Sequence, residues 1–262
     1  MMLHLPMSVS EAQQCLSEGA VPVGGATLVW AAWQRDGFPE RAMSLRNVPE
    51  ANVLGRQTLG AAVVLNRVDD RVPQVLRRAA AGVGTGAVRR TATVGGNLVG
   101  STLRCLLPAA LVLDARATVL DADGVHESDL AEVLAKRHVL LSLRWREPVA
   151  SSYRKHSGEA GGPPPLVVAA AVHGGDTPGG HGGDTPGGQG ANRLRVAVRD
   201  GYDVVSGSTP CGTGIQEALH TLRHSAVGTL HATAWEEVSR QVTGLLARVA
   251  PSSPGTTDSG TT

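Results

Sequence analysis

The chain has 262 residues, of which 42% are hydrophobic and 18% are charged, and its formal net charge is +1. This length and apolar content suffice for one large or two smaller folded domains. The scattered basic residues exclude the concentrated positive field that nucleic-acid binding needs. The first residues lack the pattern of a signal peptide, and no window is long and apolar enough to span a bilayer. We therefore expect a soluble protein with neither a nucleic-acid nor a membrane partner.

The cysteines and the overall composition indicate where the protein works. Cys15, Cys105 and Cys211 are odd in number and far apart, which excludes a disulfide framework and a paired-cysteine metal site. A reducing, cytoplasmic location is expected. Lysine is rare while Ala, Gly, Val and Arg are abundant, a bias typical of a GC-rich bacterial genome.

The first third of the chain predicts short helices and strands in alternation. Ser8 or Ser10 can cap the first helix, and Gly19 can end it. Pro73 is well placed at the start of the helix expected over 72–83. The expected elements are a helix over 11–19, a strand over 20–25, a helix over 26–35, strands over 41–48 and 57–68, and a helix over 72–83 ended by Gly82, Gly84 and Gly86.

The rest of the chain predicts a second group of elements. They are an extended segment over 91–97, a helix passing into a β-hairpin over 106–125, strands over 138–148, 151–158 and 163–172, a hairpin over 192–207 and two helices between 215 and 250. Asp123-Gly124 is a typical hairpin turn. The phrase "HGGDTPGG" occurs twice in tandem over 173–188, which predicts a flexible surface loop, and the tail 251–262 is expected to be disordered.

Two glycine pairs, Gly24-Gly25 and Gly95-Gly96, stand at predicted strand-to-helix junctions. Such junctions expose backbone N–H groups at a helix N-terminus, which favours a phosphate, and glycine lets a ligand approach closely. Together the two pairs could bind one pyrophosphate from both sides. For either pair alone, a tight turn is the better explanation of the glycines.

Other motifs give weaker indications. "GVGTG" over 82–86 follows a predicted helix rather than a strand, which argues against a dinucleotide fingerprint and for a helix end. His126, Glu127 and His138 show no metal-ligand spacing, and we interpret them as solvated charges on a helix face. His220 and His224 have helical spacing without a third ligand nearby in sequence. We therefore predict no metal site, and no catalytic residue is assigned.

Four phrases, taken in order, carry a family resemblance. They are "VGGATL" over 23–28, "SLRNVPEA" over 44–51, "VRRTATVGGN" over 88–97 and "PAALVLDA" over 108–115, with "YRK" following at 153–155. In this combination the chain resembles the FAD-binding medium subunit or domain of molybdenum hydroxylases, the group of xanthine dehydrogenase and aerobic carbon monoxide dehydrogenase.

The resemblance implies an α+β fold. A two-subdomain FAD-binding domain of the PCMH-like type is expected over 1–138. A small C-terminal domain of a sheet with helices is expected over 139–250, carrying the Gly/Pro repeat loop at 173–190.

The resemblance also implies a site. The FAD pyrophosphate is expected between the two glycine loops, and the flavin would relay electrons from iron–sulfur clusters in a partner to NAD or another acceptor. The partners implied are molybdenum-containing and iron–sulfur subunits, together with a small-molecule substrate. The cofactor-binding residues carried over by position are Gly24, Gly25, Ala26, Thr27, Leu28, Thr93, Gly95, Gly96, Asn97 and Ser101.

Two positions depart from the family pattern. Cys105 lies near an expected Asp, in a segment one residue shorter, and Thr27 stands where Asp, Asn or Ser is common. Each change removes an acceptor for the cofactor, so weaker FAD binding is expected, by about 0.5–1.5 kcal/mol per lost hydrogen bond.

Three functions therefore stay open. The leading hypothesis is an FAD-dependent oxidoreductase subunit that relays electrons. The second is a protein that has kept the fold but lost redox chemistry, forms a homodimer and catalyses a step such as cyclisation or rearrangement in a bacterial biosynthetic pathway. The third is a non-catalytic partner subunit.

Overall fold

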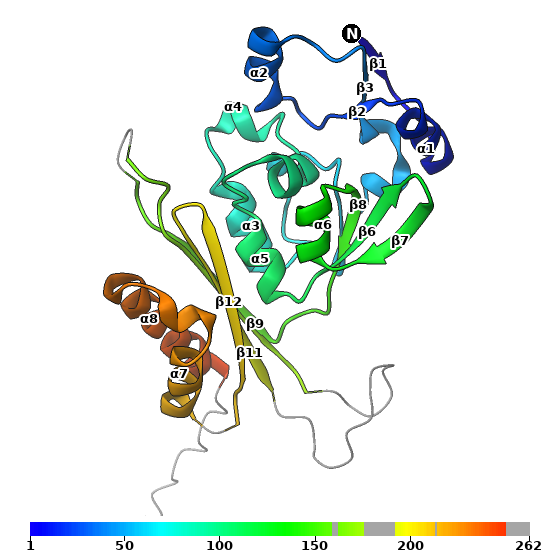
Figure 1. Ribbon diagram of the computed structural model, residues 1–262. Coiled ribbons are helices and arrows are strands. Elements are labelled where there is room, and N and C mark those ends of the chain that lie inside the picture. Colours follow the sequence, from blue (N-terminus) through cyan, green and yellow to red (C-terminus); the bar gives the residue numbers. More distant parts are fainter. Residues whose placement is uncertain (159–161, 176–191, 213, 250–262) are drawn as a thin grey trace, which may run out of the picture.

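The computed structural model describes residues 1–158, 162–175, 192–212 and 214–249. Most of the tandem repeat and the tail fall outside these residues, so the predictions made for them are not tested. Three β-sheets, each with its own helices, follow one another along the chain (Figure 1). This arrangement of mixed helices and sheets is the expected α+β class. Among the described residues, no helix combines the length and the apolar character that crossing a membrane requires.

The N-terminal sheet is parallel and has the strand order β1-β3-β2. As predicted, Ser8 caps the first helix, because its Oγ accepts the N–H of Glu11 at 3.2 Å. Gly19 ends that helix with φ 80°, a conformation that suits glycine. The elements are β1 Met2–His4, α1 Val9–Ser17, β2 Val21–Pro22, α2 Val29–Asp36 and β3 Arg41–Met43, followed by 3₁₀ turns at Leu45–Asn47 and Pro49–Ala51.

The central sheet is antiparallel, with the order β4-β5-β8-β6-β7. Its β6–β7 hairpin turns at Asp123-Gly124, as expected, and the Asp121 carboxylate accepts the N–H of Asp123 at 2.9 Å within the turn. Its elements are β4 Leu54–Gly55, β5 Thr58–Gly60, a 3₁₀ turn at Leu65–Arg67, α3 Gln74–Ala81, α4 Gly86–Arg89, α5 Leu107–Val112, β6 Arg116–Asp121, β7 Gly124–Ser128, α6 Leu130–Lys136 and β8 Val139–Arg144.

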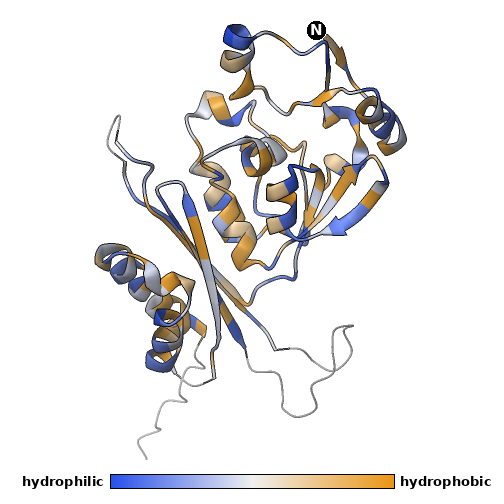
Figure 2. Ribbon diagram, in the orientation of Figure 1, coloured by the Kyte–Doolittle hydropathy of each residue, from blue (hydrophilic) through white to orange (hydrophobic). Residues whose placement is uncertain are grey.

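The C-terminal sheet is antiparallel, with the order β12-β11-β10-β9, and lies between two layers of helices (Figure 1). On one face α5 packs on β10 and β11, and on the other α7 and α8 pack on β12 and β10. Figure 2 shows hydrophobic residues along the middle of this sheet. The elements are β9 Ala150–Lys155, β10 Val167–His173, β11 Arg193–Asp200, β12 Asp203–Pro210, α7 Ile215–Arg223, a 3₁₀ turn at Ala226–Thr229 and α8 Ala232–Val249.

Two expectations need correction. The strand Val139–Arg144, which we expected in the C-terminal part, pairs with β5 and β6 in the central sheet. The strand expected over 57–68 ends at Gly60, where the chain passes so close to Ala51 that a side chain on Gly60 would lie 2.2 Å from its carbonyl oxygen. The chain then turns toward residues 92–95.

Candidate functional site

The first glycine loop, residues 23–28, joins β2 to α2. The N–H of Val23 donates to the carbonyl of Met43, which holds the start of the loop against β3, and the N–H of Trp30 donates to the carbonyl of Ala26. Ala26 has φ 54°, in the left-handed region that non-glycine residues rarely occupy. The loop is therefore fixed at both ends and strained in the middle.

The N–H groups of this loop are its most distinctive feature. All five from residues 24–28 donate no hydrogen bond within the described residues. Gly24, Thr27 and Leu28 are exposed, and Leu28 precedes α2 without a side-chain cap. Successive unpaired N–H groups at a helix N-terminus form a concavity that favours an anion such as phosphate.

The second glycine loop follows an extended segment that pairs with residues 61–64. Its N–H groups are used within the protein: Gly95 donates to the carbonyl of Ala61 at 2.8 Å, Gly96 to the Thr93 hydroxyl at 3.1 Å and Asn97 to the Thr93 carbonyl at 3.0 Å. The chain then makes a single π-helical turn at Gly96–Gly100. This loop is a rigid, internally satisfied turn rather than a row of free donors.

The structure brings the two loops into contact. A Cβ on Gly24 would lie 2.3 Å from the Thr93 hydroxyl, and one on Gly25 would lie 1.8 Å from the carbonyl oxygen of Thr91. Thr93 is buried, and its hydroxyl also receives the N–H of Gly96. Both glycine pairs therefore meet at one threonine side chain.

The four glycine positions differ in how much space they leave for a side chain. Gly24 and Gly25 have no room for a side chain because the other loop lies against them, and Gly95 has little because its Cβ would come within 3.0 Å of Ala61. A Cβ on Gly96 would meet only the Thr93 hydroxyl, at 3.0 Å, and otherwise finds no atom within 4 Å. A larger side chain at Gly96 would therefore extend into space beside the first loop.

The segment 101–106 closes the second loop. Asn97 is buried, and its Oδ1 accepts the N–H of Leu106 at 2.9 Å, while the buried Ser101 hydroxyl accepts the N–H of Leu103 at 3.2 Å. Arg104 has φ 39°, a second strained position. Asn97 and Ser101 thus shape the segment that leads to α5, and their side-chain acceptors are occupied by the chain itself.

A buried polar cluster lies where this segment meets the C-terminal sheet. Arg199, on β11, is 1% exposed and donates to the carbonyls of Leu103 and Pro165 at 2.9 and 2.8 Å and to the sulfur of Cys105 at 3.5 Å. Its Nε and the hydroxyl of Tyr153, on β9, are buried without a hydrogen-bond partner among the described residues. Buried polar atoms of this kind normally find a partner, so the cluster is incomplete in the chain alone.

Burial raises the pKa of the Tyr153 phenol, the nearby Cys105 raises it further, and Arg199 opposes the shift. The phenol is therefore a neutral hydrogen-bond donor at physiological pH. From the sequence, Tyr153 was noted only as part of a motif, and Arg199 was not predicted to have a role. The strand "RLRVAVRD" offered no distinctive signal, because by alternation Arg199 shares a face with Arg193, which is exposed, and Arg195, which is half-buried.

Comparison with known proteins decides the family. A family model described as the FAD binding domain in molybdopterin dehydrogenase matches residues 1–142. The chain belongs to this family. The matched range covers both glycine loops and the segment that closes them. A search of curated protein sequences gives no match.

Solved structures share the fold of this molybdopterin dehydrogenase family member over 95% of its length. Quinoline 2-oxidoreductase from Pseudomonas putida 86 is 17% identical, with a TM-score of 0.66 over 97% of that chain. Reconstituted CO dehydrogenase from Oligotropha carboxidovorans is 16% identical, with a TM-score of 0.70 over 98%. CO dehydrogenase from Hydrogenophaga pseudoflava, lacking the Mo-pyranopterin moiety, is 17% identical, with a TM-score of 0.68 over 98%. At this identity the likeness shows the fold.

The histidines of the family member lie differently from our expectation. His220 on α7 and His224, which caps the end of α7, have ring centroids 4.4 Å apart, but the described residues place no third ligand beside them. His126 lies on β7, and His138 lies between α6 and β8. Interpreting these two as charges on a helix face was wrong, because only the intervening residues 130–136 form the helix.

Proposed function

We propose that this chain binds FAD and acts as the electron-relaying flavin subunit of an oxidoreductase. The observation that carries the proposal is the run of five N–H groups at residues 24–28 that donate no hydrogen bond within the described residues, set against the second glycine loop. A pyrophosphate supplies the negative oxygen atoms that such a run of donors needs. The family assignment supports the same cofactor.

A second set of donors without partners among the described residues lies where the segment after the second glycine loop meets the C-terminal sheet. Arg199 Nε and the Tyr153 hydroxyl are buried donors without partners, and both belong to the cluster around Cys105. A carbonyl-rich, nitrogen-rich ring that reached this cluster could satisfy both. Bound FAD would supply hydride and one-electron transfer, while the chain binds it, orients it and keeps water from the buried cluster.

The electron donor in this proposal belongs to a partner. Cys15 lies on α1, Cys105 before α5 and Cys211 after β12, so the three free cysteines do not form an iron–sulfur site. We propose molybdenum-containing and iron–sulfur subunits as partners. Exposed apolar side chains on the N-terminal sheet and α2 support an interface there; they include Met2, Met7, Leu28, Trp30 and Phe38.

Flavin uptake tests the proposal. The purified chain should carry or take up FAD, seen as the visible absorbance of oxidised flavin and as quenching of flavin fluorescence, and should prefer FAD to FMN because the loop recognises a pyrophosphate. Gly96→Leu should abolish uptake without unfolding the chain, because a Cβ there meets no atom within 4 Å except the Thr93 hydroxyl, at 3.0 Å. Gly100→Leu is the matched control, since a Cβ there meets no atom within 4 Å.

Three outcomes would contradict the proposed flavin binding or relocate the cofactor. A colourless chain that takes up no added FAD overturns the proposal, and unchanged uptake by a folded Gly96→Leu variant moves the cofactor elsewhere. Turnover of a substrate by a flavin-free homodimer would favour the non-redox alternative. Association with iron–sulfur and molybdenum subunits, measured by size-exclusion chromatography with light scattering, tests the relay role separately from flavin binding.

A further inference from the structure

The turn end of the β6–β7 hairpin gathers three side chains with metal-binding chemistry. Asp121 ends β6, His126 lies on β7 opposite Val119, and His138 immediately precedes β8. Cross-strand partners share a face and alternate residues of a strand share a face, so Val119, Asp121 and His126 lie on the same side of the sheet. That side carries α6, whose C-terminal end delivers His138 (Figure 1).

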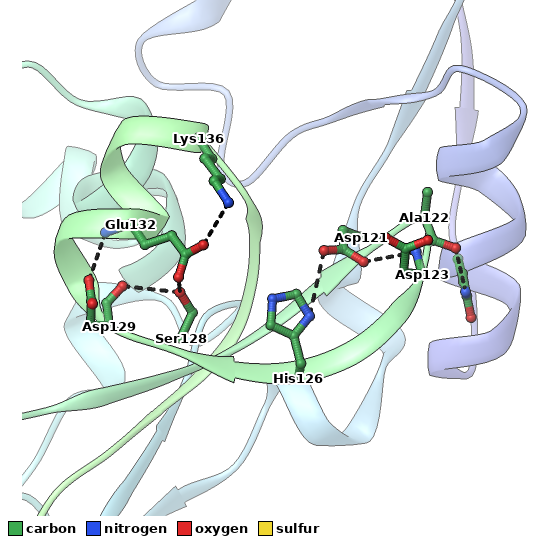
Figure 3. Close-up of polar contacts among 9 residues, drawn as sticks. Asp121, Ala122, Asp123, His126, Ser128, Asp129, Glu132 and Lys136 are labelled. Carbon is green, nitrogen blue, oxygen red and sulfur yellow. Dashed lines mark hydrogen bonds and ion pairs between the residues drawn. The ribbon is translucent and has the colours of Figure 1, made fainter.

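The three side chains are close together. His126 Nδ1 lies 3.5 Å from Asp121 Oδ2, and Figure 3 shows the imidazole directed at this carboxylate. One ligand atom from each of Asp121, His126 and His138 lies within 4.8 Å of the others. A tetrahedral zinc site with bonds of about 2.1 Å has ligand atoms roughly 3.4 Å apart, so one edge of such a site is already formed.

The backbone holds two of these side chains in place. Arg137 ends α6 with φ 54° and ψ 40°, a left-handed residue that redirects the chain so that His138 faces the hairpin. His138 Nδ1 is buried and has no hydrogen-bond partner among the described residues. The other oxygen of Asp121 accepts the N–H of Asp123 at 2.9 Å, which orients the carboxylate.

The neighbouring Lys136 ammonium does not occupy the position that a metal would take, because it is paired with Glu132. Lys136 Nζ is held by Glu132 at 2.7 Å, and Glu132 also accepts from the Ser128 hydroxyl at 2.9 Å (Figure 3). His138 thus brings an imidazole with a buried nitrogen, unpaired among the described residues, close to a second imidazole and an oriented carboxylate. Two imidazoles and one carboxylate are a ligand set typical of zinc.

We propose that Asp121, His126 and His138 bind a divalent transition-metal ion of the zinc type, with the remaining coordination position open to solvent. The ion would connect the hairpin to the loop after α6. Because the site uses neither glycine loop, it is independent of flavin binding. Binding to the folded chain alone would raise its thermal stability with metal concentration.

The experiment uses the full chain, without a histidine tag and stripped with chelator. Zinc chloride is titrated against a chromophoric chelator, and cobalt chloride is added separately to record the visible absorbance of tetrahedral Co²⁺. We expect one equivalent bound per chain. His126→Ala and His138→Ala should each weaken binding at least about tenfold and remove the cobalt bands. His231→Ala is the matched control, because His231 pairs with Asp200 at 3.2 Å without a third ligand among the described residues.

Several results would overturn the proposal. They are no zinc binding by the wild-type chain, unchanged affinity in His126→Ala, or loss of binding only in the double variant His220→Ala/His224→Ala, which would place the ion on α7. His126 is exposed, so its replacement tests the site even if His138→Ala fails to fold. In that case Asp121→Asn, which keeps the size of the side chain, is the second variant, and unchanged zinc affinity in it would also count against the site.

Discussion

The hydroxyl of Tyr153 is buried without a partner, so its removal separates cofactor binding from stability. Tyr153→Phe loses no hydrogen bond in the chain alone, and its free energy of unfolding should be unchanged or higher by up to about 1 kcal/mol. Its affinity for FAD should fall by about 0.5–1.5 kcal/mol if the cofactor accepts from that hydroxyl. Urea unfolding and flavin fluorescence titration measure the two effects.

Tyr202→Phe is the control for this change, because Tyr202 is 64% exposed. Neither quantity should change in that variant. Destabilisation of Tyr153→Phe by more than about 1 kcal/mol would mean that the hydroxyl is hydrogen-bonded within the protein.

His173 gives the folded chain a pH dependence. Its Nε2 lies 2.8 Å from the carbonyl of Val112, which joins β10 to the end of α5. Burial lowers the pKa of His173 below its ordinary value of about 6.5, against the smaller effect of that hydrogen bond. Below about pH 6.5 the unfolded chain binds a proton that the folded chain resists, so the free energy of unfolding falls as the pH falls through this window.

Urea unfolding at about pH 7.5 and about pH 5.5 measures this effect. His173→Gln should lose stability at the higher pH and show a smaller decrease between the two. His220→Gln, at an exposed position on α7, should keep the decrease of the wild type. An equal decrease in His173→Gln would assign the pH dependence to other groups.

Alternate side chains of strand β10 belong to two different hydrophobic cores, one on each face of the sheet. Val168, Ala170 and Val172 pack with α7 and α8, whereas Ala169 and Ala171 face the core that includes α5. Ala169 is fully buried, so Ala169→Leu should overpack that face and cost about 1–3 kcal/mol. Ser206→Leu, at an exposed position on β12, should change the free energy of unfolding by at most about 0.5 kcal/mol. Equal costs would mean that the α5 face of the sheet is loosely packed.

Local signals predicted the regular elements well. The Ser8 cap, the Asp123-Gly124 turn and the continuous apolar run of β10 each act through neighbours in sequence or through burial on both faces, which a pattern reports. The sheet to which β8 belongs could not be predicted, because its pairing with β5 and β6 joins segments far apart in the chain. Likewise, the residues that follow Gly60 hydrogen-bond to residues 92–95, which lie much further along the chain.

The candidate site was predictable only in part. The glycine pairs and the resemblance pointed to two loops, and the structure places these in contact through Thr93. The sequence could not distinguish the loop with free N–H groups from the loop with paired ones, since both contain the same Gly-Gly phrase. The Asp121, His126 and His138 cluster was missed because a left-handed residue at Arg137, invisible to spacing rules, brings the third side chain to the hairpin.

On the scale of the whole molecule, one hydrophobic core crosses the boundary between the family-matched part and the C-terminal sheet. It contains Leu106 and Leu113 from around α5 together with Tyr153, Val167 and Ala197 from β9–β11. Unfolding one part would expose the core of the other, so both should unfold in a single transition. Calorimetric and van't Hoff enthalpies should agree, and the fluorescence of Trp235 on α8 should change together with far-ultraviolet circular dichroism. Two separated transitions would show that the parts fold independently.

The first glycine loop also affects how the sequence can vary. Its five donors belong to the main chain, so replacing the side chain of Thr27 or Leu28 leaves every one of them in place. What the loop does require is space, at Gly24 and Gly25, and a left-handed residue at Ala26. Substitutions are therefore tolerated at the exposed positions Thr27 and Leu28. They are unfavourable at Gly24, Gly25 and Ala26, where the backbone geometry restricts the side chain. A loop that offers only main-chain donors to an anion can keep its binding ability while most of the surrounding side chains change.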